Sequence, residues 1–196
     1  MDVRSSLGVE ALLVVANTRH GPGGHRGLRA RPGEPMHDHL ADPAEACRFL
    51  VDHDVEVPSD PPDPEALEAL RLIRRHVRAL AGDPGLPATG VGVASAAGPG
   101  EEEIRALFER HPVHLDPDGA LTPAGAPGGW DAFVGDLLPP LVSIRRDRDR
   151  LRLCGNPQCR FLFLDRSRNA SRVWCEMAVC GNRVRGRRHR LRRLAG

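Results

Sequence analysis

The chain contains neither lysine nor tyrosine, and only 4% of its residues are aromatic. All 28 of its positively charged side chains are therefore arginines. Arginine in place of lysine, together with 21 glycines and 18 prolines, is typical of the codon bias of a GC-rich genome, so the missing lysine says little about function. The scarcity of aromatic residues leaves few side chains for stacking the bases of single-stranded RNA.

Long apolar runs are absent too. The run over residues 11–16 is far shorter than the roughly 20 residues that a membrane helix needs. Residues 1–10 mix acidic residues with one arginine and do not resemble a signal peptide. The glycine-rich stretch 90–100 lacks the glycine-lysine-serine/threonine end of a P-loop. We therefore expect a cytoplasmic protein with no membrane partner.

Acidic and basic residues are divided unevenly along the chain. Residues 145–196 hold 16 arginines and 4 acidic residues, a net charge of +12. Residues 1–144 hold the other 12 arginines and 22 acidic residues, a net charge of −10. Such asymmetry predicts a basic interaction module attached to a more acidic body. The predicted domains are residues 1–144 and 145–196.

Four of the five cysteines lie in the basic module, as Cys154, Cys159, Cys175 and Cys180. Two pairs with four residues inside each pair are separated by fifteen residues, a spacing typical of a structural four-cysteine zinc site. A module this short cannot bury enough surface to fold alone, and zinc would supply the missing stability. We expect one structural Zn²⁺ per chain. The isolated Cys47 is expected to be a small buried hydrophobe.

Between the cysteine pairs, residues 160–165 are predicted to form a strand, residues 167–170 a turn and residues 171–174 the returning strand. A helix is predicted over residues 182–194, with Asn182 as its N-cap. At 100° per residue, Val184, Leu191 and Leu194 share one side and should pack on the hairpin. The opposite side is basic.

Arginine's fork of donors suits phosphate groups, so the basic side is interpreted as a nucleic-acid contact. The alternative is a solvated face that keeps the module soluble. The candidate contact residues are Arg166, Arg168, Arg172, Arg183, Arg185, Arg188, His189, Arg192 and Arg193.

Three further side chains of the module have competing interpretations. Trp174, directly before a cysteine, is expected in the core, the alternative being a base-stacking role. Asp165 is expected to pair with a nearby arginine of the module, or else to touch DNA. His189 is not expected to bind zinc, because four cysteines complete a tetrahedron.

The first 144 residues predict mainly helices. The run Val9–Ala16 favours a buried strand, although periodicity does not separate it from a helix. Residues 20–35 and 57–64 are predicted loops. Helices are expected over residues 43–52, 64–81, 101–110 and 130–138, and after Pro139-Pro140 a second helical segment resumes over 141–149. A hairpin is expected to join residues 113–115 and 120–122.

Several motifs resemble known families. Leu151-Arg-Leu-Cys154, Phe163-Leu-Asp165-Arg-Ser-Arg-Asn169, Arg172-Val-Trp-Cys175-Glu-Met177 and Cys180-Gly-Asn-Arg183 resemble the CGNR-type zinc finger over about residues 148–193. More loosely, Ala16-Asn17-Thr18, Asp38-His39-Leu40 and the helix from Glu65 are similar to the ABATE domain, which precedes this finger in stress-induced transcription regulators. The resemblance implies zinc at the four cysteines and DNA binding by the finger.

The predicted fold is α+β and mainly helical. It comprises a helical N-terminal domain with a small antiparallel sheet, followed by a zinc module built of a knuckle, a β-hairpin and a C-terminal helix. The leading functional hypothesis is a nucleoid-associated bacterial transcription regulator. Its N-terminal domain would bind a small-molecule or protein partner, or mediate assembly into a homo-oligomer.

Three alternatives stay open at this point. RNA would fit the charge pattern equally well. The basic face would also suit an acidic protein partner, including the chain's own body. An enzyme is not expected, because no nucleophile–base set or carboxylate pair stands out. His37 and His39 would suit a loop metal site, but alternating polar residues in such a stretch favour solvated side chains.

Overall fold

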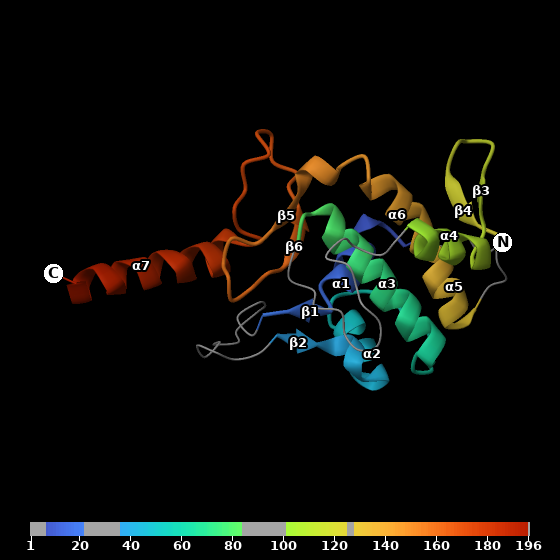
Figure 1. Cartoon of the computed structure of the whole chain (residues 1–196), viewed down its shortest axis with the longest axis horizontal. Coiled ribbons are helices and arrows are strands. Elements are labelled where there is room, and N and C mark those ends of the chain that lie inside the picture. Colours follow the sequence, from blue (N-terminus) through green and yellow to red (C-terminus); the bar gives the residue numbers. More distant parts are fainter. Residues whose placement is uncertain (1–6, 22–35, 84–100, 125–127, 196) are drawn as a thin grey trace.

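The computed structural model describes residues 7–21, 36–83, 101–124 and 128–195. Most of the loop predicted over 20–35, and the glycine-rich stretch 84–100, lie outside these residues. The described part is mainly helical with small antiparallel sheets, as predicted. Figure 1 shows a helical body, with one helix at the C-terminal end pointing away from it. None of the described helices combines the length and apolar character needed to cross a bilayer.

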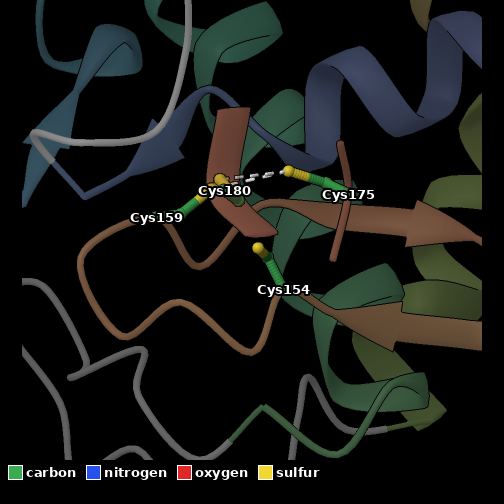
Figure 2. A group of neighbouring side chains, drawn as sticks. All are labelled: Cys154, Cys159, Cys175 and Cys180. Atoms are coloured by element: carbon green, nitrogen blue, oxygen red, sulfur yellow. Dashed lines mark hydrogen bonds between the residues drawn. The ribbon is translucent and has the colours of Figure 1, made fainter. Parts of the chain in front are cut away.

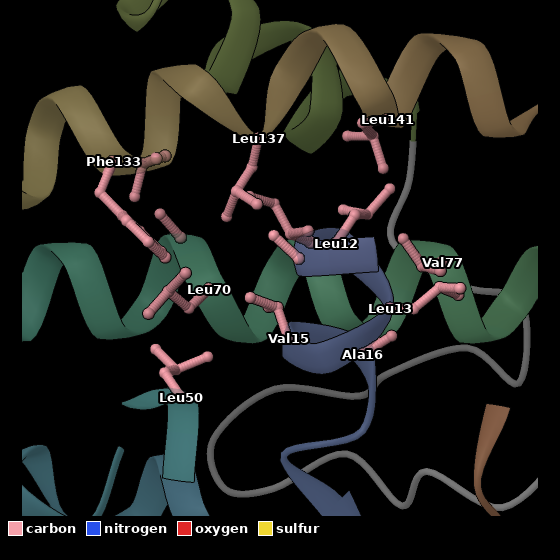
Figure 3. Close-up of a cluster of buried hydrophobic side chains, with 14 of the residues drawn as sticks. Leu12, Leu13, Val15, Ala16, Leu50, Leu70, Val77, Phe133, Leu137 and Leu141 are labelled. Atoms are coloured by element: carbon pink, nitrogen blue, oxygen red, sulfur yellow. The ribbon is translucent and has the colours of Figure 1, made fainter. Parts of the chain in front are cut away.

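The hydrophobic core lies where four helices meet (Figure 3). They are α1 (Val9–Ala16), α3 (Pro64–Leu80), α5 (Gly129–Asp136) and α6 (Leu138–Ile144). Leu12 of α1 and Leu70 of α3 are fully buried, as is Leu137 at the junction of α5 and α6. Apolar burial of this kind contributes about 25 cal/mol per Å² and is what holds the body together.

The expectation of a strand over Val9–Ala16 is wrong, because these residues form α1. Five of its eight residues are buried, and Val14 is half-buried. A helix that is apolar on nearly every side shows no 3.6-residue period, so it cannot be told from a buried strand by pattern. Packing of α1 against both α3 and α6 favours the helix over the strand.

The helices that begin with an aspartate followed by proline match the prediction. In α2 (Pro43–Val51), the side chain of Asp42 accepts a hydrogen bond from the backbone N–H of Glu45 at 2.8 Å. In α3, Asp63 accepts from Ala66 at 2.8 Å. Proline suits the first helical position because its missing N–H needs no partner there. The short 3₁₀ helix η1 (His39–Ala41) precedes α2.

The next part of the body also follows the prediction closely. Helix α4 spans Glu101–Arg110, and β3 (Val113–Leu115) pairs antiparallel with β4 (Leu121–Pro123). The break between α5 and α6 falls at Leu137, not at Pro139-Pro140 as expected. Both prolines lie in the first turn of α6, where proline is tolerated, so the second segment begins earlier than predicted.

The zinc-module hairpin pairs differently from the prediction. Strand β6 (Leu162–Leu164) pairs with β5 (Leu151–Leu153), which precedes the first cysteine and follows the 3₁₀ helix η2 (Arg148–Arg150). Residues 171–174 form no strand. The first cysteine pair therefore lies in the loop of this hairpin, residues 154–161, and not before its first strand as predicted.

The β5–β6 hairpin is packed directly on the helical body. Leu151 and Leu162 belong to the same buried cluster as α1 and α3. The side chain of Asn17, just after α1, donates to the carbonyl of Leu162 at 2.8 Å and accepts from its N–H at 2.7 Å. Both bonds are buried, so the amide completes the edge of β6 as another strand would.

Candidate zinc centre and basic helix

The four cysteines predicted to bind zinc come together in space, with their ligand atoms all within 4.8 Å of one another. Figure 2 shows Cys154 and Cys159 on the β5–β6 hairpin, with Cys175 and Cys180 approaching from the chain that follows. Cys154, Cys159 and Cys180 are buried, and Cys175 is half-buried. Cys180 lies in a π-helical turn (Met177–Gly181) that leads into α7 (Asn182–Ala195).

The sulfur spacing fits a tetrahedral zinc ion. The Sγ atom of Cys175 lies 3.7 Å from the Sγ of Cys159 and 3.7 Å from that of Cys180. Ligands at the usual Zn–S distance of about 2.3 Å are about 3.8 Å apart in a tetrahedron. A disulfide needs about 2 Å, and all four thiols are free. The group therefore fits one zinc ion that is fully coordinated by protein.

The close approach of the thiols shifts their acidity. The thiols of Cys159 and Cys175 donate hydrogen bonds to Cys154 and lower its pKa to about 2. Donation to Cys154 raises the pKa of Cys159 and that of Cys175. A metal ion that binds these cysteines would displace the protons that the thiols retain.

Asn156 supports the cysteines in a way that the sequence reasoning missed. Its buried side-chain amide donates to the Sγ of Cys180 at 3.7 Å, and its backbone carbonyl accepts from the N–H of Cys159 at 2.9 Å. A donor to a metal-bound thiolate spreads part of its negative charge. No local pattern predicts this role, because the thiolate partner lies 24 residues away in the sequence.

The zinc centre also contacts the body through Gly21. Its N–H donates to the carbonyl of Cys159 at 2.9 Å, and a Cβ on Gly21 would lie 2.2 Å from the carbonyl oxygen of Gln158. That oxygen belongs to backbone in the cysteine loop, which cannot rotate aside. The two chains therefore meet too closely for any side chain at position 21.

Gly21→Ala is expected to destabilise the protein by about 1–3 kcal/mol, the usual cost of overpacking. The matched control is Gly8→Ala, because an added Cβ at Gly8 meets nothing within 4 Å. Urea unfolding of both variants in zinc-loaded form measures the difference. Equal urea midpoints for Gly21→Ala and Gly8→Ala would show that the cysteine loop can move away from Gly21 at no cost in stability.

Helix α7 does not pack as predicted. It leaves the cysteine cluster and points away from the rest of the chain (Figure 1). Val184 is half-buried, but Leu191 is 58% exposed and Leu194 is 85% exposed, so the expectation that all three pack on the hairpin is wrong. Asn182 does not cap the helix either, because its side chain donates to the carbonyl of Ala178 at 3.1 Å and the helical turn begins earlier.

The candidate nucleic-acid-binding residues fall into two groups. Arg183 is half-buried, and the other candidates on α7 are exposed, namely Arg185, Arg188, His189, Arg192 and Arg193. The candidates in the loop after β6 are exposed as well, but two of them have partners. Arg166 pairs with Glu10 at 2.5 Å, and Arg172 donates to the carbonyl of Cys175 at 2.6 Å and lies over the ring of Phe163. Arg168 is exposed on the same loop.

Asp165 has a structural role other than the predicted ion pair. The carboxylate is buried and accepts from the backbone N–H groups of Ser167 at 2.9 Å and Arg172 at 2.7 Å. Hydrogen bonds from Ser167 and Arg172 hold the pKa of Asp165 below its usual range. The residue therefore shapes the loop that carries Arg166, Arg168 and Arg172.

Three further side chains with separate predictions are Trp174, His189 and Cys47. Trp174 is half-buried and packs against the cysteine cluster. His189 is exposed on α7 and is not part of the four-cysteine group. Cys47 is half-buried against the main core, and burial raises the pKa of its thiol.

A second group of metal-capable side chains lies in the body, formed by His37, His39 and Glu45, with ligand atoms within 4.8 Å of one another. The alternating polar residues of this stretch favour solvated histidines. The residue that points to a metal site instead is Glu45 in the first turn of α2, six residues after His39. Burial lowers the pKa of His39 to about 4 and also lowers that of His20, whose ring lies beside it. Both imidazoles are therefore neutral at pH 7.

Comparison with family models identifies both parts of the chain. The CGNR zinc finger model matches residues 150–193. The ABATE model, described as "Putative stress-induced transcription regulator", matches residues 11–144, which is more than half of the chain. Neither is an enzyme family. The comparison with curated proteins found no match. The chain therefore belongs to the ABATE family and carries a CGNR zinc finger after the ABATE domain.

Proposed function

We propose that this protein regulates transcription by binding duplex DNA through its zinc finger, with α7 as the element that enters the major groove. The observation that carries the proposal is the position of α7. Seven of its 14 residues are arginines, and the helix extends beyond the body instead of packing on it. Zinc would hold the cysteine loops that anchor the first turn of this helix.

The dimensions and charge distribution of α7 suit a groove. Fourteen residues at about 1.5 Å each give a helix about 21 Å long, and the major groove of B-DNA, about 12 Å wide, admits one helix. At 100° per residue the arginines are spread around most of the circumference, and the widest gap between them holds Val184 and Leu191. A groove has a phosphate wall on each side, so charge on opposite sides of one helix is useful there.

Three exposed arginines of α7, Arg185, Arg188 and Arg192, are available for such contacts. Within the part of the chain that the structure describes, no carboxylate pairs with Arg185, Arg188 or Arg192. The net charge of +12 over residues 145–196 exceeds the −2 that a zinc ion with four thiolates would contribute. A docked complex between α7 and the chain's own acidic body is therefore less favoured than contact with phosphates.

RNA is the second candidate, and the shape of α7 argues against it. The major groove of A-form RNA is deep and narrow, and side chains do not read it. Single-stranded RNA is recognised largely by stacking on aromatic side chains. Trp174 is half-buried in the cysteine cluster, and α7 has no aromatic residue other than His189. Competition between duplex DNA and RNA of the same length separates the two partners.

In this proposal residues 145–196 bind DNA, and residues 1–144 sense a signal or mediate assembly. The two buried hydrogen bonds between Asn17 and Leu162 support communication between the two parts, because neither can move far without breaking them. A small-molecule or protein ligand of the body would then alter the position of the finger. A homo-oligomer would bring two α7 helices to one site.

Binding of zinc-loaded protein to a labelled duplex tests the proposal. About five phosphate contacts predict that log K falls with log salt at a slope of about −4 to −5. The variant Arg185→Ala/Arg188→Ala/Arg192→Ala should reduce the slope by about 3, one for each contact. The control, Arg48→Ala/Arg105→Ala on α2 and α4, should leave it unchanged. The absence of binding at low salt by the zinc-loaded protein would refute DNA recognition.

A further inference from the structure

The histidine–glutamate group in the body contains a hydrogen-bond chain that fixes which ring nitrogens carry protons. The Nδ1 atom of His20 lies 2.9 Å from the carbonyl oxygen of Gly21. A carbonyl oxygen only accepts, so Nδ1 of His20 carries the proton and its Nε2 has a lone pair. The Nε2 atom of His39 lies 3.1 Å from Nε2 of His20 and must donate to its lone pair.

This assignment leaves the other nitrogen of His39 without a proton. A neutral imidazole has one N–H, and His39 uses it toward His20, so Nδ1 of His39 has a lone pair. That Nδ1 is buried and has no hydrogen-bond partner, although the Oε1 atom of Glu45 lies 3.1 Å away. Two electron-rich atoms face each other at this distance, and a cation between them would satisfy both.

A third donor completes the arrangement. The Nε2 atom of His37 also contacts Oε1 of Glu45, and the rings of His37 and His39 lie 4.2 Å apart between centroids. Each ligand comes from a different element, namely strand β2 (His37–Asp38), η1 and the first turn of α2. We propose that His37, His39 and Glu45 bind a second metal ion, a divalent transition metal such as Zn²⁺, independently of the four cysteines.

The donor set and its surroundings resemble a built metal site. Two imidazoles and one carboxylate suit zinc and neighbouring transition metals, and metal-binding histidines commonly donate their other N–H to a second group. Here His20 accepts that N–H, and Phe49 stacks on the ring of His39 with centroids 4.2 Å apart. His20 and Phe49 would thus hold His39 in one orientation.

Three protein ligands leave at least one coordination position open. The side chain of His37 is 51% exposed, and that of Glu45 is 28% exposed, so the open position faces solvent. An ion there would bind water or a small anionic ligand, in contrast to the closed four-cysteine site. The site is also close to the finger, because His20 precedes Gly21, whose N–H donates to Cys159. An ion here would therefore be well placed for a sensing role.

Metal titration of the full-length protein tests the second site. With the four cysteines already filled by zinc, added Co²⁺ should bind once more per chain. Its visible spectrum should report nitrogen and oxygen ligands, without the charge-transfer bands that thiolate ligands produce. Calorimetry with Zn²⁺ should give the same stoichiometry. A zinc-loaded protein that takes up no further Co²⁺ or Zn²⁺ would overturn the proposal.

Variants assign the additional ion to these residues. His39→Ala and Glu45→Gln should each abolish the additional binding, while zinc at the four cysteines stays unchanged. His20→Ala should weaken it about 10–100-fold, as expected for a residue that positions a ligand. His37→Asn should also abolish the additional binding. Because His37 is exposed, this variant is expected to fold, so its loss of binding would not result from misfolding. The control is His114→Ala, because His114 also contacts a carboxylate, Asp116 at 3.0 Å, but lacks a second histidine. Binding that survives in His39→Ala and Glu45→Gln would contradict the assignment.

Discussion

Cys159→Ser is expected to lower the unfolding free energy of the whole protein by at least about 5 kcal/mol. Structural zinc contributes on the order of 10 kcal/mol or more in small zinc modules, and serine is a poor zinc ligand. The Cys159 side chain is fully buried, and its carbonyl accepts from Gly21 of the body. For a chain of this length the loss corresponds to a fall in Tm of about 10–20 °C. Calorimetry measures the fall in Tm, and metal analysis measures the zinc content of the variant.

Two comparisons separate zinc loss from simple loss of a buried thiol. Cys47→Ser changes a half-buried cysteine outside the zinc group and should shift Tm by only a few degrees. A strong chelator should lower the Tm of the wild type to that of Cys159→Ser and leave the variant unchanged. A variant that unfolds like the wild type, with one zinc still bound, would show that Cys159 is not a ligand.

The elements that were predicted correctly have strong local signals. Asp42-Pro43 and Asp63-Pro64 mark helix starts through a capping side chain and a proline, and both helices begin there. The cysteine spacing likewise indicated the metal group, because each pair lies within a few residues of chain. These features depend on neighbours in sequence, and the sequence contains them in full.

The elements that were missed depend on partners far away along the chain. Strand β6 pairs with β5 rather than with residues 171–174, and its edge is completed by Asn17, 145 residues away. Leu191 and Leu194 have a helical apolar spacing, yet α7 extends beyond any surface of the described residues that would cover them. Periodicity shows which side chains share a face but not whether a partner surface exists.

The zinc centre and the histidine group have aromatic neighbours in common, an arrangement that no local pattern in the sequence predicts. Phe49 of α2 is buried in the same small cluster as Cys154, Cys159 and Cys180, and its other side stacks on His39. The ring of His20 lies 5.3 Å from that of Phe161 in the cysteine loop. A change at the histidine group therefore has a short packed route to the finger, which is a physical basis for coupling a signal to α7.

Arg78→Met is the second substitution with a large expected effect, about 3–5 kcal/mol of unfolding free energy. The Arg78 side chain is 1% exposed, and it pairs with the equally buried carboxylate of Asp83 at 2.5 Å. It also donates to the carbonyls of Ala16 at 3.1 Å and Arg160 at 3.0 Å. One guanidinium thus joins the end of α1, the end of α3 and the loop after Cys159.

The loss would reach the zinc module because of the backbone at Arg160. This residue has a φ of 55°, a left-handed conformation that is costly for arginine. Its carbonyl is held by Arg78, and its side chain contacts Asp83. Methionine at position 78 fills a similar volume but supplies no donor, so the carbonyls of Ala16 and Arg160 lose a partner and Asp83 loses one of its cations.

Chemical denaturation of zinc-loaded protein measures the effect, with Arg75→Met as the matched control. Arg75 is one turn from Arg78 on α3 but is 30% exposed and pairs with the exposed Glu68 at 3.2 Å, so its loss should cost less than about 1 kcal/mol. Adding Asp83→Asn to Arg78→Met should recover part of the stability, because it removes a buried charge that has lost a partner. Equal costs for Arg78→Met and Arg75→Met would mean that the buried arginine does not link the body to the finger.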